Sequence, residues 1–338
     1  MSTNTLQAMA LVMGASIINA VYTLPMRANR KWAWENSWFA FSILGVAVVP
    51  SLITIATVPG LWSIYAAVPA VTLAKMAFFG LLWGICLVLF GLAIPMIGLA
   101  ITFAVSLGTS AACGSLLPLL MNDPGRLFTP AGLFISIGLA VIIAGVALCG
   151  AAGRLRERLE GKDQPQRLSG FYKGFIYTLL SGVLGCMLNV GLASGGEIQR
   201  LAFQKGASQA MMSNAVWLPC LYAGFLPGVV YCLYLMKKNG TTGKLIHASR
   251  WYYWIMAALM GGCWFGSIVA YSLATVKLGD LGPVIGWPLF MSCIVIVSMV
   301  TGLITGEWSK TGSRPVMIMA GGIVCLLAAI GILSYAVR

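Results

Sequence analysis

The chain has 338 residues, of which 59% are hydrophobic and only 9% charged, and its mean hydropathy is +0.92. A soluble domain averages about 45–50% apolar and about 25% charged residues. This composition therefore excludes a soluble globular domain, a coiled coil and a disordered segment. Because open sheets leave backbone polar groups unpaired in hydrocarbon, we predict an all-α integral membrane protein.

The formal charge of +13 lies mostly between the apolar runs, so it predicts membrane topology and not a nucleic-acid partner. Nine cysteines all fall inside apolar runs, and none forms a Cys-x-x-Cys pair. We expect small buried apolar side chains there, with no disulfide framework, metal site or cofactor.

Ten apolar runs are long enough to span a bilayer, which takes about 20 residues. They cover roughly 6–26, 34–57, 70–93, 98–121, 128–152, 171–193, 209–236, 251–275, 283–305 and 315–337. No basic segment precedes the first run, which we therefore expect to be a retained helix and not a signal peptide. The third and fourth runs are separated only by a short turn containing Pro95 and Gly98.

The distribution of basic residues predicts the orientation, because Lys and Arg stay on the cytoplasmic side. The segments after helices 1, 3, 5, 7 and 9 hold 15 Lys and Arg residues, and the opposite side holds 6. Both termini of this multi-pass protein should therefore lie outside, away from the cytoplasm.

A polar stretch divides the chain into two halves of five helices each. We assign 1–153 to the first half, 154–170 to a cytoplasmic linker loop and 171–338 to the second half. At an offset of 181 residues, Gly80 and Trp83 fall on Gly261 and Trp264, and four further identities follow in the same helices. An odd number of helices per half inverts the second half, and such inverted repeats are typical of secondary transporters.

Only eight acidic residues are present. Glu157 lies in the basic central segment, where we expect a solvated charge run. Glu35 lies between Trp34 and Trp38 near the start of the second run. Two roles stay open for it: an acid that caps a helix start within an aromatic belt, or a proton-coupling and substrate-binding group.

Polar and aromatic side chains within the spans are candidates for a binding site, since polar groups in hydrocarbon need a partner or a ligand. A pocket for a neutral polar solute requires flat apolar walls and a few hydrogen-bonding groups. The candidate substrate-binding residues are Asn19, Glu35, Trp38, Trp83, Asn189, Asn214, Trp264, Tyr271 and Trp287. The alternative for each is ordinary hydrogen bonding or packing between helices.

Enzyme signatures are missing from the sequence. His247 is the only histidine and lies in a basic segment, so no histidine-based metal site or catalytic dyad can form within the membrane. No Gly-x4-Gly-Lys-Ser/Thr phosphate loop occurs, which excludes an ATPase within this chain. We predict no catalytic residue.

The chain resembles the L-rhamnose–proton symporter family, a branch of the drug/metabolite transporter superfamily. Four stretches carry the resemblance: Arg30-Lys31-Trp32-Ala33-Trp34-Glu35; Leu82-Trp83-Gly84 with Gly91-Leu92 and Leu99-Ala100; Met187-Leu188-Asn189; and Gly306-Glu307-Trp308 followed by Gly312-Ser313-Arg314-Pro315-Val316. The resemblance implies ten helices in two inverted halves and proton-driven sugar import across the bacterial inner membrane. It places Glu35 and Asn189 at family positions.

The chain departs from that family at residues 283–287, where the rhamnose carrier has a polar segment with Asp and Tyr and this chain has Pro-Val-Ile-Gly-Trp. We predict a secondary transporter that imports L-rhamnose or a related 6-deoxyhexose with protons, with Glu35 as the protonated group. Alternatives are an exporter of drugs or metabolites, a carrier of another polar metabolite, sodium coupling, and a non-transporting scaffold or receptor. The expected partners are the sugar, protons and the lipid bilayer.

Overall fold

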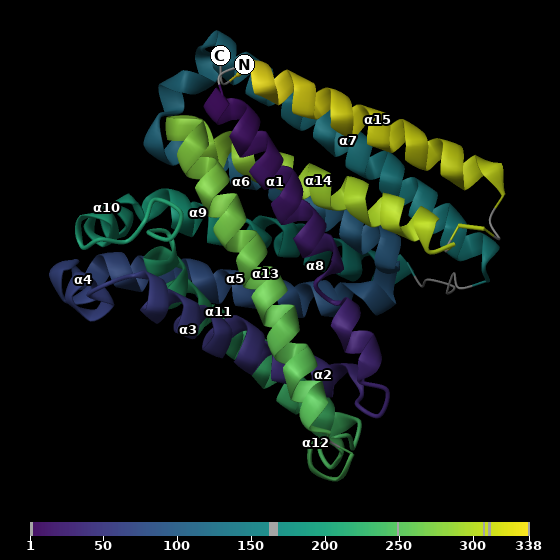
Figure 1. The fold of residues 1–338 in the computed structure, drawn as a ribbon. Helices are drawn as coiled ribbons and strands as arrows, with labels where there is room; N and C mark the ends of the chain where they lie inside the picture. The colour runs from purple at the N-terminus through teal and green to yellow at the C-terminus, as the bar shows by residue number, and fades with distance from the viewer. Residues whose placement is uncertain (1–2, 162–167, 249, 307, 310–311, 337–338) are drawn as a thin grey trace.

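The computed structural model describes residues 3–161, 168–248, 250–306, 308–309 and 312–336, and this part of the chain is helical without a strand (Figure 1). The α-helices are α1 (Thr3–Val21), α2 (Trp34–Phe41), α3 (Val49–Thr57), α4 (Leu61–Ala67), α5 (Ala70–Ile97), α6 (Leu99–Asn122), α7 (Pro130–Leu159), α8 (Leu168–Gly185), α9 (Met187–Ser194), α10 (Gly196–Gln204), α11 (Asn214–Lys238), α12 (Lys244–His247), α13 (Trp251–Leu278), α14 (Gly282–Ile304) and α15 (Ser313–Tyr335). Short 3-10 turns are η1 (Leu24–Ala28), η3 (Pro124–Phe128) and η4 (Gly279–Leu281), and η2 (Ser42–Val48) is a π-helix.

Nine stretches of the described residues are long and apolar enough to cross a membrane. The longest of them, Trp251–Ile304, contains two helices of 28 and 23 residues, α13 and α14, joined by η4. The predicted turn between the third and fourth runs is present, because α5 ends at Ile97 and α6 begins at Leu99. Gly98 between them has a φ of +85°, which glycine adopts without a steric penalty.

Several helix boundaries differ from those that the hydropathy pattern predicts. α1 ends at Val21 and not at 26, and α5 continues past 93 to Ile97. α7 continues to Leu159, past its predicted end at 152 and into the segment assigned to a loop. Arg and Glu side chains are good helix formers, so the apolar pattern stops before the helix does. α11 begins at Asn214 and not at 209, because residues 208–213 form turns before it.

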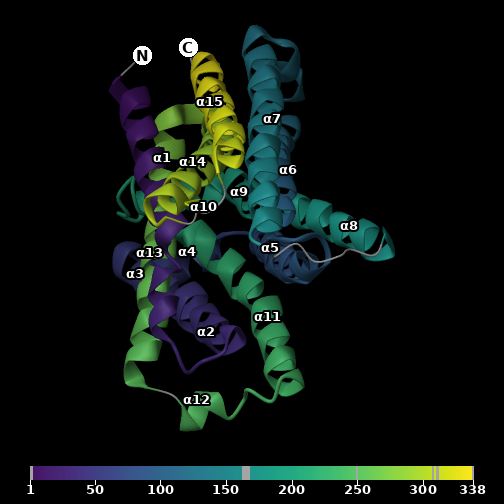
Figure 2. The same cartoon turned by 90° about the vertical axis from the view of Figure 1, so that its right-hand side faces the viewer.

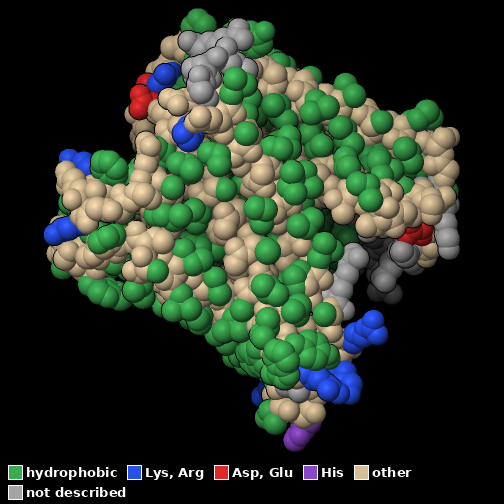
Figure 3. All heavy atoms as spheres, in the orientation of Figure 1, with side chains coloured by type: hydrophobic (Ala, Val, Ile, Leu, Met, Phe, Trp, Pro, Cys, Tyr) green, Lys and Arg blue, Asp and Glu red, His purple; other side chains and the backbone are tan. Residues whose placement is uncertain are grey.

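The helices run between two ends of the molecule. The terminal end carries both chain termini together with α4 and α10, and the loop end carries α12 and the connections from α1 to α2 and from α5 to α6 (Figure 1). α7 and α15 lie side by side on one edge of the molecule, whereas α13 runs to the opposite corner at α12 (Figures 1 and 2). Hydrophobic side chains are spread over the whole visible face, and Lys and Arg lie near its edges (Figure 3).

The cysteines largely agree with the expectation of buried apolar residues. All nine are free, and six of them are buried. Cys113 and Cys325 are half-buried, and Cys263 is exposed on α13, so for Cys263 the expectation is wrong. Exposure of a small apolar thiol toward lipid costs little, because lipid tails are as apolar as the protein interior.

Two close helix crossings depend on glycine. A Cβ at Gly80 of α5 would lie 1.8 Å from the carbonyl oxygen of Cys220 on α11, and one at Gly84 would lie 2.2 Å from the carbonyl oxygen of Gly224. At the second crossing, a Cβ at Gly261 of α13 would lie 2.2 Å from the Cα of Gly45 in η2. Apolar surface gives no net attraction between helices in lipid, so such backbone proximity supplies the van der Waals contact that holds them together.

The π-helix η2 has a local cause. Pro50 follows it in the first turn of α3 and has no N–H to donate to a carbonyl one turn earlier. Its ring also clashes with that carbonyl in a regular α-helix, and a wider π turn relieves the clash. The widened segment contains Gly45, the residue that α13 approaches.

We predict that Gly261→Ala lowers the stability of the protein by about 1–3 kcal/mol, the usual cost of overpacking. The added methyl group meets backbone atoms of Gly45, which have no room to yield. Thermal unfolding in detergent micelles measures the effect. Gly262→Ala is the matched control, because a Cβ at Gly262 would meet no atom within 4 Å; equal melting temperatures for the two variants would contradict the tight crossing.

Candidate functional site

Asn189 on α9 joins helices from both halves of the chain near the terminal end. Its Nδ2 donates hydrogen bonds to the carbonyl oxygens of Gly114 on α6, at 2.8 Å, and Pro283 on α14, at 2.9 Å. Its Oδ1 accepts a hydrogen bond from the hydroxyl of Tyr271 on α13. Both Asn189 and Tyr271 are fully buried. With both amide hydrogens donated to carbonyls, the side chain has no donor left for a ligand in this conformation.

Trp287 on α14 closes the same region. Its Nε1 donates to the carbonyl oxygen and to Oγ of Ser110 on α6, at 3.1 and 3.2 Å. The indole lies directly over Gly114, where a Cβ would be 2.1 Å from its Cδ1. Tyr271 packs edge-on against Trp287, with 5.6 Å between ring centroids. We call Asn189, Tyr271, Trp287, Ser110 and Gly114 the terminal-end seal.

Two tryptophans from different halves of the chain form the central stack. Trp83 of α5 and Trp264 of α13 lie 5.5 Å apart between ring centroids with 20° between planes. Asn19 of α1 donates to Oγ of Ser267 at 2.8 Å, and that hydroxyl donates to the carbonyl oxygen of Trp264 at 2.6 Å. Neither indole N–H donates to another described residue, and the Oδ1 of half-buried Asn19 accepts nothing from the described part of the chain. These groups could bind hydroxyls.

Glu35 lies at the loop end, on the face of α2 that contacts α11. One carboxylate oxygen, Oε1, accepts from Oγ1 of Thr241 at 2.7 Å and from Nδ2 of Asn239 at 3.1 Å. The residue is 6% exposed, and no Lys or Arg nitrogen of the described residues lies within 4.0 Å of it. The capping function belongs to Asn36, whose Oδ1 accepts from the backbone N–H of Ala33 at 3.0 Å. Glu35 lies in the first turn of α2 and connects this helix to the segment after α11.

Asn214 stands apart from the other candidates. It begins α11 at the terminal end and donates from Nδ2 to Oγ1 of Thr57 at 3.1 Å. It is fully buried, and its Oδ1 has no hydrogen-bond partner among the described residues. No hydrogen bond connects it to the seal or to the central stack within the described part of the chain.

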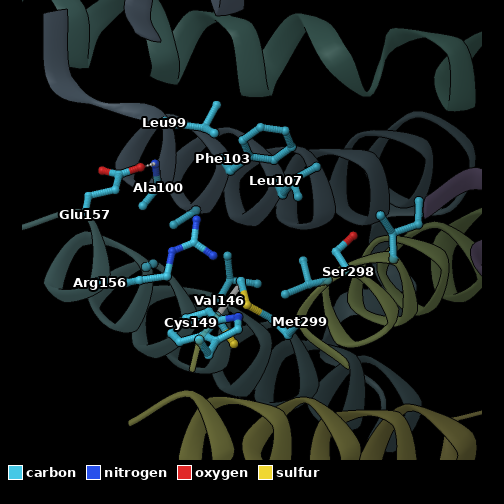
Figure 4. Close-up of a pocket in the computed structure, with 16 residues that line it drawn as sticks. Leu99, Ala100, Phe103, Leu107, Val146, Cys149, Arg156, Glu157, Ser298 and Met299 are labelled. Carbon is cyan, nitrogen blue, oxygen red and sulfur yellow. Dashed lines mark hydrogen bonds between the residues drawn. The ribbon is translucent and has the colours of Figure 1, made fainter. Parts of the chain in front are cut away.

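A cavity of about 230 Å³ separates α6 from α14 at the loop end (Figure 4). Its walls are mainly apolar, with Phe103 and Leu107 on α6 and Met299 on α14, and α7 forms a third wall. Arg156 and Glu157 of α7 also line it. The cavity contains none of the nine residues predicted for the binding site.

Glu157 does not lie in a solvated charge run as the sequence predicts. It is half-buried, and its Oε1 accepts from the backbone N–H of Ala100 at 3.2 Å, in the first turn of α6. A carboxylate at a helix N-terminus satisfies an otherwise unpaired N–H and is stabilised by the helix dipole. The guanidinium carbon Cζ of the neighbouring Arg156 lies 5.0 Å from the ring centroid of Trp308, and its Nε lies 3.8 Å from Oε1 of Glu160.

The nine predicted residues thus fall into distinct groups. Asn189, Tyr271 and Trp287 meet in the seal. Trp83, Trp264 and Asn19 meet at the central stack, which Trp38 reaches through Phe41. Glu35 and Asn214 stand alone. The sequence analysis missed Ser110, Ser267 and Thr241 as partners, since a single hydroxyl gives no periodic or motif signal.

The helices, the apolar surface and the polar side chains hydrogen-bonded between helices define a multi-pass α-helical membrane protein. Comparison with known families is more specific: the L-rhamnose-proton symport protein family (RhaT) matches residues 2–337. The chain belongs to this family, whose members are transporters.

Curated relatives agree with this assignment. The L-rhamnose-proton symporter of Cronobacter sakazakii is 25% identical over 326 residues, covering 93% of each chain. Those of Shigella sonnei and Escherichia coli are each 23% identical, over 328 and 323 residues, with 93% of each chain covered.

We predict that Tyr271→Phe lowers stability by about 1–3 kcal/mol, because it leaves the buried Oδ1 of Asn189 without its donor. Thermal unfolding measures the loss. Tyr234→Phe is the control, as Tyr234 is 57% exposed on α11. Combining Tyr271→Phe with Asn189→Ala should cost less than the sum of the single changes; strict additivity would show that the two side chains are not coupled.

Proposed function

We propose that the protein is a secondary transporter that imports L-rhamnose together with protons. The observation that carries the proposal is the match of the rhamnose–proton symport family to nearly the whole chain. The relatives named L-rhamnose-proton symporter support it, since each aligns over 93% of both chains. A related 6-deoxyhexose is the alternative substrate, because residues 283–287 depart from the rhamnose carrier.

The transporter would be built from two inverted repeats of five membrane crossings, as in the drug/metabolite transporter superfamily. Counting α13 and α14 separately gives ten crossings, with residues 1–153 and 171–338 as the repeats and the segment between them as the linker. The packing supports the pairing: α1 contacts α13 and α14, while α8, five crossings later, contacts α5 and α6. Trp83 and Trp264, at equivalent positions, contact each other, as residues on a two-fold axis would.

The central stack is the proposed substrate site. A 6-deoxyhexose has an apolar face and a methyl group that can pack on indole rings, and hydroxyls that need hydrogen-bonding partners. Trp83, Trp264 and Asn19 offer both kinds of group from three helices. Substrate sites of repeat-built transporters lie between the repeats near the bilayer midplane, which this position fits.

In this conformation the terminal-end seal closes the route of the sugar toward the terminal end. Asn189 and Trp287 bond α9 and α14 to α6 there, whereas α6 and α14 part at the loop end around the cavity of Figure 4. Alternating access would break the seal and close the loop end. The excess of Lys and Arg at the loop end supports an orientation in the bacterial inner membrane with the loop end in the cytoplasm and both termini outside.

Glu35 is the proposed proton-coupling residue. Charge-assisted hydrogen bonds are roughly twice as strong as neutral ones. The ionised carboxylate therefore holds α2 to Asn239 and Thr241, and protonation would weaken both bonds. α2 would then be free to move relative to α11, which links proton binding to rearrangement of the loop end.

Uptake of radiolabelled L-rhamnose into proteoliposomes under an imposed inward proton gradient tests the proposal. We expect accumulation against the sugar gradient, its loss on addition of a protonophore, and competition by 6-deoxyhexoses alone. Uptake that requires a sodium gradient and not a proton gradient would identify sodium as the coupling ion. Absence of L-rhamnose uptake by correctly folded protein would refute the substrate assignment.

For Glu35→Gln we predict loss of proton-driven accumulation with retention of sugar exchange. The neutral amide mimics the protonated carboxyl, so the variant binds sugar without responding to the proton gradient. Uptake and counterflow in proteoliposomes measure the two activities separately. Glu197→Gln is the control, an exposed acid on α10 at the terminal end; a Glu35→Gln protein that still concentrates sugar would refute the coupling role.

A further inference from the structure

A continuous row of aromatic rings leads from the loop end to the central stack. Trp34 and Trp38 are stacked 5.4 Å apart between centroids with 12° between planes. Trp38 contacts Phe41 at 5.2 Å, and Phe41 contacts Trp264 at 6.3 Å. Trp83 completes the row through the central stack. We call these five residues the aromatic row.

The three residues of the row that belong to α2 share one face of that helix. Positions 34, 38 and 41 follow the i, i+4, i+7 spacing that aligns side chains on a helix. Glu35 and Asn36 turn instead toward α11 and the segment after it, through their hydrogen bonds to Asn239 and Thr241. α2 itself lies between α11 and α13 at the loop end (Figure 2).

The two tryptophans at the loop end are the accessible part of the row. Trp34 is 44% exposed and Trp38 is half-buried, whereas Phe41, Trp264 and Trp83 are all buried. A solute that approaches from the loop end therefore meets Trp34 and Trp38 before it reaches the central stack.

The indole N–H groups distinguish the row from structural tryptophans. Trp32, Trp217 and Trp287 donate to Lys244, Ser272 and Ser110 and so tie helices together. The row contains four tryptophans, Trp34, Trp38, Trp83 and Trp264. Their indole N–H groups donate no hydrogen bond to another described residue, and these groups are not completely buried. They present apolar ring faces together with unused donors, which is the combination that a pyranose ring with hydroxyls requires.

We propose that Trp34 and Trp38 form a second carbohydrate subsite, at the loop end, that captures or releases the sugar on its way to or from the central stack. The inference rests on the proposed function, because the occupant is the transported 6-deoxyhexose. The sugar stacks its apolar face on the indoles of Trp34 and Trp38 at the loop end, on the same row of ring contacts as the central stack. Such a subsite changes the rate of exchange and leaves affinity at the central stack unchanged.

Counterflow exchange of radiolabelled L-rhamnose in proteoliposomes and equilibrium binding to the purified protein test this subsite together. Trp34→Ala should lower kcat/KM of exchange roughly tenfold, the loss of one to two favourable aromatic contacts, with an unchanged Kd. Trp34→Phe should retain fast exchange because it keeps an aromatic ring, whereas Trp34→Leu should exchange slowly because it has none. Trp38→Phe provides a second retained-ring variant.

Trp251→Ala is the matched control, since Trp251 is 75% exposed at the same end and its ring is paired with that of Tyr252, outside the aromatic row. The subsite is refuted if Trp34→Ala exchanges sugar as fast as Trp251→Ala, or if Trp34→Leu equals Trp34→Phe. A fall in binding affinity for Trp34→Ala that accounts for the whole loss of exchange would also refute it. Failure of the wild-type protein to exchange L-rhamnose would instead refute the proposed function, and the subsite with it.

Discussion

Hydrocarbon gives no net attraction between apolar helices, and this constraint shapes the whole structure. Helices that are apolar on all sides can pack in many ways, so the arrangement depends on the few places where something more specific is possible. Gly80 and Gly261 let helix backbones approach each other, and Asn189 bonds α9 to α6, α13 and α14. The helix order in space follows from these contacts.

The same contacts make the two ends of the molecule different. At the terminal end, Trp287 lies over Gly114 and bonds to Ser110, so α6 and α14 are in direct contact. At the loop end, the same two helices part around an apolar cavity. A protein that must open alternately to its two sides needs contacts at one end that can be exchanged for contacts at the other. Hydrogen bonds to carbonyls, such as those of Asn189, can be broken and re-formed without leaving a charge in the membrane.

Buried polar groups serve different purposes in this protein, and their partners show which. Asn189 and Trp287 use all their donors on the protein, as expected of groups that hold a conformation. Trp83, Trp264 and Asn19 keep donors or an acceptor unused around the central stack, as expected of groups that await a solute. Glu35 is different again, because it is a buried carboxylate that accepts hydrogen bonds from neutral donors and has no described Lys or Arg nitrogen within 4.0 Å. A change in its protonation state alters two hydrogen bonds between α2 and the segment after α11.

The sequence by itself determined that the helices lie in a lipid bilayer, how many apolar runs the chain has, and where most of the long helices begin and end. Hydropathy is additive along a chain, and Gly98 marks a turn through its own backbone freedom. The sequence also named Asn189, Tyr271, Trp83 and Trp264 as polar or aromatic groups in unusual places, because each is exceptional within its own helix.

Only the tertiary structure decided which of them meet. That Tyr271 bonds to Asn189, that Trp83 stacks on Trp264, and that Glu157 caps α6 in place of facing water are facts about helices distant in the chain. A local pattern sets how far a helix extends and which residues share its face. It does not set which neighbour that face contacts, since lipid and protein are equally apolar surroundings for most of the surface.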